Sequence, residues 1–285
     1  MTNPREMLTA YGLSPKKALG QNFLHDPNAV EKIASIGVQS ADEAVLEIGP
    51  GVGALTEALA KRARRVVAVE LDESLTPILH DRLKPYANVE IVYGDILKQD
   101  PAAVMGADAE NYVVAANVPY YITSAILRHL LESSARPRRL TIMMQMEVAE
   151  KLIAKPGDMS LLTVSVQYYA KAQIAAKFPP AVFFPRPDVY SAVVRLDVFE
   201  TPPVDAPEAV FFQVAKAGFS QKRKQLKNSL GSGLHIETAE AAALCITAGI
   251  DPQRRPETLT LAEWAALARA WEGKRAGHTL SDLDS

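Results

Sequence analysis

Val45-Leu46-Glu47-Ile48-Gly49-Pro50-Gly51-Val52-Gly53 is the stretch that decides the fold, and a helix-like run, residues 54–60, follows it. This order predicts a strand, a glycine loop and a helix. The glycines let the backbone approach a nucleotide-like ligand closely. The loop lacks the Gly-Lys-Ser/Thr ending of a P-loop, and the Glu47 carboxylate would repel a pyrophosphate, so ATP and NAD are disfavoured.

Three further predicted strands also end in a polar residue. Residues 66–69 lead to Glu70, residues 89–93 to Asp95 and residues 112–116 to Asn117. In open parallel sheets, ligands bind at the carboxyl ends of the strands. Glu70 can accept hydrogen bonds from ribose hydroxyls, and Asp95 from an adenine amino group. Each residue alone also suits a solvated turn, but the series favours a cofactor with adenine, ribose and a positive amino-acid end, S-adenosylmethionine.

Asn117-Val118-Pro119-Tyr120 indicates transfer of a methyl group to an amine. The lone pair of an amine on an aromatic base is delocalised, and it becomes nucleophilic when acceptors draw the nitrogen toward tetrahedral geometry. The Asn117 side-chain oxygen and the Val118 carbonyl can accept the two amine hydrogens. Tyr120 offers a stacking face, and Pro119 stiffens the turn through its fixed φ. The same residues after a strand also suit an ordinary turn.

The chain resembles the ribosomal RNA adenine dimethyltransferases, the KsgA family of bacterial small-subunit rRNA enzymes, over nearly its whole length. The matching stretches are Leu19-Gly20-Gln21-Asn22-Phe23-Leu24 with Asp26, residues 47–53, Glu70, Gly94-Asp95, residues 117–120, Gln145 with Glu147-Val148-Ala149, Phe183-Phe184-Pro185-Arg186-Pro187, Ser191-Ala192-Val193-Val194, residues 219–230 and Arg255-Pro256-Glu257.

This resemblance implies an S-adenosylmethionine-dependent enzyme with a defined site. The implied reaction dimethylates two adjacent adenosines in a hairpin loop near the 3′ end of 16S rRNA, within a pre-formed small (30S) subunit. Tyr120 and Phe183 are implied to sandwich the target adenine, which adds Phe183 to the catalytic set. An N-terminal segment, residues 1–40, is implied to cap the cofactor. With the loop included, the expected cofactor contacts are Asn22, Leu24, Glu47, Gly49, Gly51, Gly53, Glu70, Asp95 and Asn117.

Three residues depart from the family pattern. Tyr121 replaces the usual Asn after the Asn117–Tyr120 run and is bulky enough to alter the pocket wall. Met146 replaces a basic residue and removes one RNA contact. Tyr190 replaces the aspartate before Ser191, with no consequence that the sequence explains.

Composition agrees with a soluble cytoplasmic enzyme of one large or two smaller domains. The 285 residues are 48% hydrophobic, which is ample for a core. A single cysteine, Cys245, excludes an internal disulfide and a cysteine-based zinc cluster. The five histidines show no metal-ligand spacing, no signal peptide opens the chain, and no apolar run reaches the ~18 residues of a membrane span. We expect a monomer without a metal or a membrane segment.

The net charge of −2 argues against RNA binding by bulk electrostatics, so the distribution of charge matters more. Residues 216–227 carry five cations and no acid: Lys216, Lys222, Arg223, Lys224 and Lys227. We interpret this stretch as a basic, RNA-binding helix; a solvated helix face is the alternative.

The pattern of elements predicts an α/β, doubly wound, Rossmann-like methyltransferase sheet with a small C-terminal helical domain. Residues 1–200 form the expected catalytic domain, in which Leu161–Tyr169 and residues 191–199 are predicted strands. A Pro-rich linker, residues 201–207, leads to a helical RNA-binding domain at 208–276 and a polar tail at 277–285.

Three other functions remain open from the sequence. An Erm-type methyltransferase shares this fold and the Asn-to-Tyr motif but acts on large-subunit rRNA. A ribosome-assembly binding factor with incidental catalysis would need the basic residues and tolerate loss of Asn117. A small-molecule methyltransferase is disfavoured by the basic stretch and the appended domain.

Overall fold

The computed structural model describes residues 3–221 and 223–281. The chain divides into two compact units, each described by itself below. Unit 1 comprises Met1–Glu150 and Ala170–Glu200, and unit 2 comprises Lys151–Tyr169 and Thr201–Ser285. No helix among the described residues is both long and apolar enough to cross a membrane.

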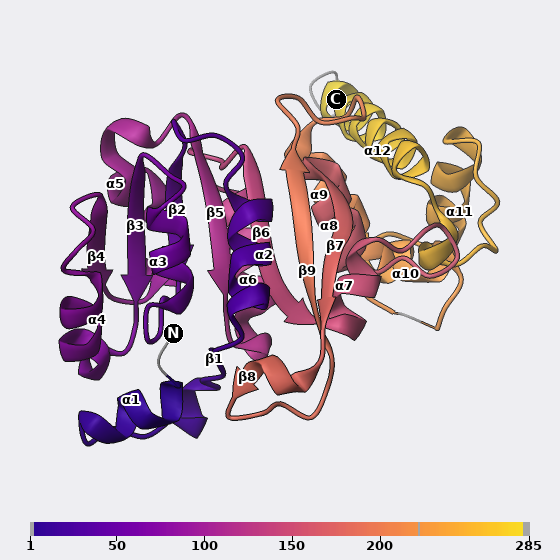
Figure 1. Ribbon diagram of the computed structural model, residues 1–285. Helices are drawn as coiled ribbons and strands as arrows, with labels where there is room; N and C mark the ends of the chain where they lie inside the picture. Colours follow the sequence, from indigo (N-terminus) through magenta and orange to yellow (C-terminus); the bar gives the residue numbers. More distant parts are fainter. Residues whose placement is uncertain (1–2, 222, 282–285) are drawn as a thin grey trace. The chain divides into compact units, whose positions relative to one another are not determined.

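Unit 1 is built on a mostly parallel sheet whose described strands lie in the order β4-β3-β2-β5-β6-β9-β7 (Figure 1). The strands are β2 (Ala44–Ile48), β3 (Arg65–Glu70), β4 (Val89–Tyr93), β5 (Tyr112–Asn117), β6 (Arg139–Gln145), β7 (Ala170–Phe178) and β9 (Ser191–Val198). Strands β2 to β6 run parallel to one another, and β9 runs antiparallel to β6 and β7. The predicted α/β, Rossmann-like sheet is confirmed.

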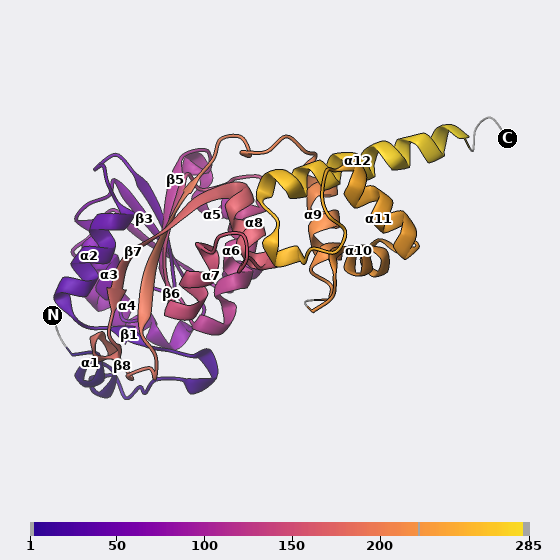
Figure 2. The same ribbon diagram turned by 90° about the vertical axis from the view of Figure 1, so that its right-hand side faces the viewer.

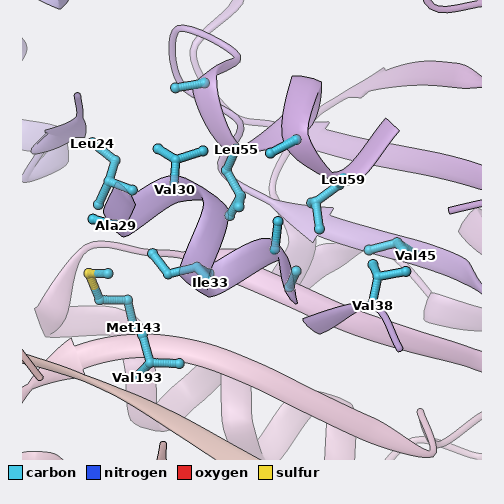
Figure 3. Close-up of a cluster of buried hydrophobic side chains, with 14 of the residues drawn as sticks. Leu24, Ala29, Val30, Ile33, Val38, Val45, Leu55, Leu59, Met143 and Val193 are labelled. Atoms are coloured by element: carbon cyan, nitrogen blue, oxygen red, sulfur yellow. The ribbon is translucent and has the colours of Figure 1, made fainter. Parts of the chain in front are cut away.

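Helices cover this sheet and bury its apolar strands. The helices of unit 1 are α1 (Pro4–Ala10), α2 (Pro27–Gly37), α3 (Ala54–Ala60), α4 (Thr76–Leu83), α5 (Pro101–Met105), α6 (Thr123–Leu131) and α7 (Met146–Leu152), which crosses the boundary of the unit. Asp26 begins α2 by accepting a hydrogen bond from Ala29 N at 2.8 Å. Leucine, isoleucine and valine side chains of α2 and α3 meet Val45 and Val193 of the sheet (Figure 3). This packing fixes the loop between β2 and α3.

The N-terminal segment is tied to the rest of unit 1 by contacts far apart in the sequence. Strand β1 (Phe23–Leu24) pairs antiparallel with β8 (Phe183–Phe184). Asp72, just beyond β3, accepts hydrogen bonds from Lys16 Nζ at 2.6 Å and from Gln21 Nε2 at 2.8 Å. Burial acts to raise the pKa of Asp72, but hydrogen bonds from Lys16, Ser74 and Gln21 outweigh it and hold that pKa below its ordinary value.

Unit 2 is helical. Its helices are α8 (Leu161–Tyr169), α9 (Glu208–Gly218), α10 (Leu226–Leu234), α11 (Thr238–Thr247) and α12 (Leu261–Ser281). Figure 2 shows α12 beside α9 and α11, and the Trp264 side chain of α12 is fully buried. The helical C-terminal part is as predicted, but α12 runs to Ser281, beyond the expected start of the tail, and residues 282–285 lie outside the described residues.

The prediction of a strand at Leu161–Tyr169 was wrong, because this segment is helix α8. Its valines and tyrosines favour a strand by propensity, yet Ser160 and Thr163 form reciprocal hydrogen bonds at the helix start. The buried residues of this helix lie on several of its sides. One of them, Tyr168, contacts Phe211 and Phe212 of α9. A buried helix of this length has no clear polar face, so periodicity cannot separate it from a strand.

Glu47 of β2 is a buried acid without a cationic partner among the described residues. Its side chain is 1% exposed, and neither carboxylate oxygen has a hydrogen-bond partner among the described residues. Burial, with repulsion from Glu70 added, outweighs the lowering influence of the nearby Thr56 hydroxyl and raises the pKa of Glu47 to about 8. The Glu47 carboxyl is therefore harder to ionise than an exposed glutamate.

We predict that Glu47 makes the free protein less stable as the pH rises from 4.5 to about 8. In that window the folded state binds more protons than the unfolded state, so the free energy of unfolding falls by up to about 1.4 kcal/mol per pH unit. Urea unfolding of Glu47→Gln across this range should show a stability advantage over the unsubstituted protein that grows with pH. Parallel pH curves would contradict this assignment.

We also predict that Asp72→Ala releases the N-terminal segment, because Lys16 and Gln21 lose their shared acceptor. Hydrogen exchange followed by mass spectrometry should show faster exchange in residues 16–24, with α2 unchanged. Asp42→Ala, an exposed carboxylate in unit 1, is the matched control. Equal exchange in both variants would mean that β1 pairing alone holds the segment.

Candidate active site

A cavity of about 110 Å³ lies in unit 1 at the carboxyl ends of the parallel strands. Four loops, which follow β2, β3, β4 and β5, contribute to its wall, together with the N-terminal segment. Of the residues predicted from the sequence, those that line it are Asn22, Leu24, Gly49, Gly51, Glu70, Asp95, Asn117, Val118, Pro119 and Tyr120. The structure thus brings together residues that lie almost 100 positions apart in the chain.

The glycine loop is held in shape by Glu70. Its carboxylate accepts a hydrogen bond from Gly51 N at 3.0 Å and another from Asp72 N at 2.8 Å. Gly51 has a φ of +58°, and a Cβ at this position would meet the Phe23 ring at 2.9 Å. Only glycine therefore suits both the turn and the close approach of the N-terminal segment. Burial raises the pKa of Glu70, against the opposing backbone hydrogen bonds.

Asn117 is oriented by the N-terminal segment. Its Nδ2 donates to the carbonyl of Asn22 at 3.1 Å. With the nitrogen engaged there, the side-chain Oδ1 is left to accept a hydrogen bond at the cavity. The next carbonyl, of Val118, has no donor within residues 3–221 and 223–281. Two acceptors from adjacent residues are thus present at one edge of the cavity.

Tyr120 lines the cavity beside these acceptors and begins a short 3₁₀ turn, Tyr120–Ile122. Its hydroxyl lies 2.7 Å from the hydroxyl of Ser191. Burial raises the pKa of Tyr120, so the phenol stays neutral. An aromatic face at this position suits a flat ligand.

Asp95 lies two residues beyond β4 and caps the 3₁₀ turn Ile96–Lys98. Its Oδ1 accepts a hydrogen bond from Leu97 N at 3.0 Å, and its Oδ2 lies 3.9 Å from Lys98 Nζ. The capping hydrogen bond from Leu97 N orients the Asp95 carboxylate at the cavity wall.

Three predicted site residues do not line the cavity. Glu47 is buried beneath the glycine loop, and Gly53 begins α3 with a φ of +80°. Phe183 is 3% exposed and belongs to the hydrophobic cluster beneath α2 and α3. Its expected role in an aromatic sandwich stays a prediction.

Sequence reasoning missed several cavity residues, among them Leu71, Ile96 and Ile122. Leu71 and Ile96 directly follow Glu70 and Asp95, and Ile122 lies two residues after Tyr120, so their closeness in sequence to predicted site residues was the available signal. Tyr121, noted as a departure, also lines the cavity and is 66% exposed.

The basic stretch in unit 2 is not one helix, contrary to the prediction. Helix α9 ends at Gly218, and α10 begins at Leu226 after a turn in which Lys224 N donates to Gln221 O. The two helices pack so closely that a Cβ on Gly233 would lie 2.4 Å from Ala217 Cα, which requires a sharp reversal between them.

The cations of the basic stretch are distributed along this reversal of the chain. Lys216 lies on α9, Arg223 and Lys224 on the turn, and Lys227 on α10. None of these four has an ion-pair partner within the described part of the chain. Lys222 lies outside the described residues.

Comparison with known proteins places this geometry in a family. The family described as ribosomal RNA adenine dimethylase matches residues 12–270. "Ribosomal RNA small subunit methyltransferase A" of Geobacillus kaustophilus is 47% identical over 275 residues, covering 93% of this chain and 94% of the relative. The protein of the same name from Dehalococcoides mccartyi is 42% identical, covering 96% and 94%.

Solved structures agree with the fold. The 23S rRNA methyltransferase ErmE matches with a TM-score of 0.68 and 28% identity, covering 88% of this chain and 99% of that chain. A dimethyladenosine transferase from Plasmodium falciparum has a TM-score of 0.73 at 22% identity, covering 88% and 98%, which supports the fold alone. On the match across residues 12–270 and the identity to its bacterial relatives, the chain belongs to the ribosomal RNA adenine dimethylase family.

Proposed function

We propose that this protein transfers methyl groups from S-adenosylmethionine to the exocyclic amines of two adjacent adenosines near the 3′ end of 16S rRNA. The adenosines lie in a hairpin loop of the small ribosomal subunit, and the product is dimethyladenosine. The observation that carries the proposal is Asn117, whose nitrogen is held by Asn22 so that its oxygen is left to accept from an amine. The names of the bacterial relatives support the small-subunit substrate.

The cavity fits S-adenosylmethionine in the chemistry of its lining. Gly49 and Gly51 leave room for close approach to the backbone, and both have positive φ. Glu70 offers acceptors for ribose hydroxyls, and Asp95 offers one for an adenine amino group. Glu47 and Gly53 would act through the shape of the loop. When bound, the cofactor supplies an electrophilic methyl group on a sulfonium.

The protein's part in the reaction is to orient the amine and exclude water. Asn117 Oδ1 and the Val118 carbonyl accept the two amine hydrogens and direct the nitrogen lone pair into the cavity. The amine becomes strongly acidic once it is methylated, so its proton can leave through a water bound at the Val118 carbonyl. No strong base is needed, and we assign that role neither to Asp95 nor to Glu47.

The target base has to leave its stack to reach this cavity. Extrusion from a duplex costs a few kcal/mol and least for an unpaired base, while stacking returns roughly 1–3 kcal/mol. Tyr120 supplies the stacking face at the cavity. This near balance favours an adenine in a loop over one in a helix.

We assign RNA contacts to the cations of the α9–α10 reversal. Lys216, Arg223 and Lys224 are exposed and lack ion-pair partners among the described residues, which leaves them available to phosphates. One chain carries both the cavity and these cations, which supports action as a monomer. A ribosomal RNA substrate supports the cytoplasm as its place of action.

We predict that Asn117→Ala lowers the single-turnover rate of methyl transfer to unmethylated small subunits by roughly 100-fold, since the amine loses an orienting acceptor. Binding to the subunit should survive. Asn111→Ala, an exposed residue just before the same strand, is the control. Unchanged transfer in Asn117→Ala would reject this mechanism, and loss of subunit binding would point to a structural effect.

We predict that replacing Lys216, Arg223 and Lys224 together by Ala weakens RNA binding and flattens its salt dependence. Three lost phosphate contacts should reduce the slope of log K against log salt by about 2, at about 0.7 per contact on single strands. A charge-matched variant with Lys32, Lys84 and Lys171, all exposed in unit 1, replaced by Ala controls for net charge. An unaltered slope would place the RNA site elsewhere.

A further inference from the structure

We propose that Ser191 is a positioning residue for methyl transfer, because its hydroxyl holds the Tyr120 ring in the orientation that receives the target base. This inference rests on the proposed function. The two hydroxyl oxygens are 2.7 Å apart, Ser191 is fully buried, and Tyr120 lines the cavity. Ser191 itself does not line the cavity, so it acts through Tyr120.

The anchor comes from a rigid part of the sheet. Ser191 begins β9, which pairs on both sides, and its partners in register are Gln145 of β6 and Phe178 of β7. The preceding carbonyl, of Tyr190, accepts a hydrogen bond from Met146 N at 3.0 Å. A side chain as short as serine on a backbone held from both sides has little freedom to move.

Tyr120, the residue that Ser191 holds, lies on less regular backbone. Tyr120 follows β5 and begins the short 3₁₀ turn, which is closed by Ile122 N donating to Pro119 O at 3.2 Å. The phenol oxygen is the far end of the side chain, so a hydrogen bond there restrains both side-chain torsions of Tyr120. Because the ring face sets the plane of a stacked base, this restraint sets the direction of the target amine.

The chemistry of stacking also points to an anchoring role for the hydroxyl. A phenylalanine ring would stack on a base as a tyrosine ring does. Stacking alone therefore does not require the Tyr120 hydroxyl, and its role is the hydrogen bond to Ser191. Within the Ser191-Ala192-Val193-Val194 motif, the other three residues are fully buried apolar residues of the core strand, which leaves Ser191 as the member with a polar function.

The test is a double-mutant cycle of Ser191→Ala and Tyr120→Phe. Single-turnover methyl transfer to unmethylated small subunits, equilibrium binding of S-adenosylmethionine and of small subunits, and thermal unfolding are measured for each variant. Either change should lower the transfer rate roughly tenfold, and the double variant should be no slower than the single variants. The affinity for the cofactor and for the subunit should stay within about twofold. The hydrogen bond between Tyr120 and Ser191 orients the target base and contacts neither the cofactor nor the rest of the subunit.

Tyr112→Phe is the matched control, because the Tyr112 hydroxyl is also bonded inside unit 1, to Ala135 O at 2.8 Å, away from the cavity. It should transfer methyl groups at the original rate. The inference would be overturned if the rate losses of the two single changes multiplied in the double variant, or if both single variants kept the original rate. An equal loss of rate in Tyr112→Phe would also overturn it. If Ser191→Ala does not fold, Tyr120→Phe alone decides, since an unchanged rate there overturns it. Failure of the unsubstituted protein to methylate small subunits would instead refute the proposed function.

Discussion

The parallel pairing of β2 with β3 and β5 is the constraint on which the rest of the structure depends. Ile48 lies in register with Val69 and with Ala116, so the residues that follow these three strands emerge side by side. Gly49 N continues the ladder by donating to Val69 O at 2.9 Å. The glycine loop, the Glu70 carboxylate and the Asn117 amide therefore lie together at one edge of the sheet, because the register of the strands places them there.

The N-terminal segment completes this edge. Asn22 orients the Asn117 amide, Phe23 packs against Gly51, and Asp72 holds the preceding turn. Each contact joins the segment to a different strand end, so its attachment and the shape of the cavity are coupled. A segment held this way can both shield a reaction from water and pre-orient its acceptors.

Local patterns predicted much of this architecture. The apolar runs that form β2, β3 and β5 are buried, and the residues at their ends, Gly49, Glu70 and Asn117, line the cavity. Sequence reasoning failed where tertiary packing decides the outcome. Helix α8 is buried among aromatic side chains, and the basic stretch contains the turn that lets α10 pack closely against α9, where Gly233 meets Ala217. The bond between Tyr120 and Ser191 spans 71 positions, and neither residue alone signals it.

The central claim is that the cavity delivers methyl groups to adenines of small-subunit rRNA. The most direct measurement is transfer of labelled methyl from S-adenosylmethionine to unmethylated small subunits, naked small-subunit rRNA and large-subunit rRNA in parallel, followed by nucleoside analysis. We predict that dimethyladenosine forms chiefly on small subunits. Label confined to large-subunit rRNA, or no label on any of the three, would contradict it.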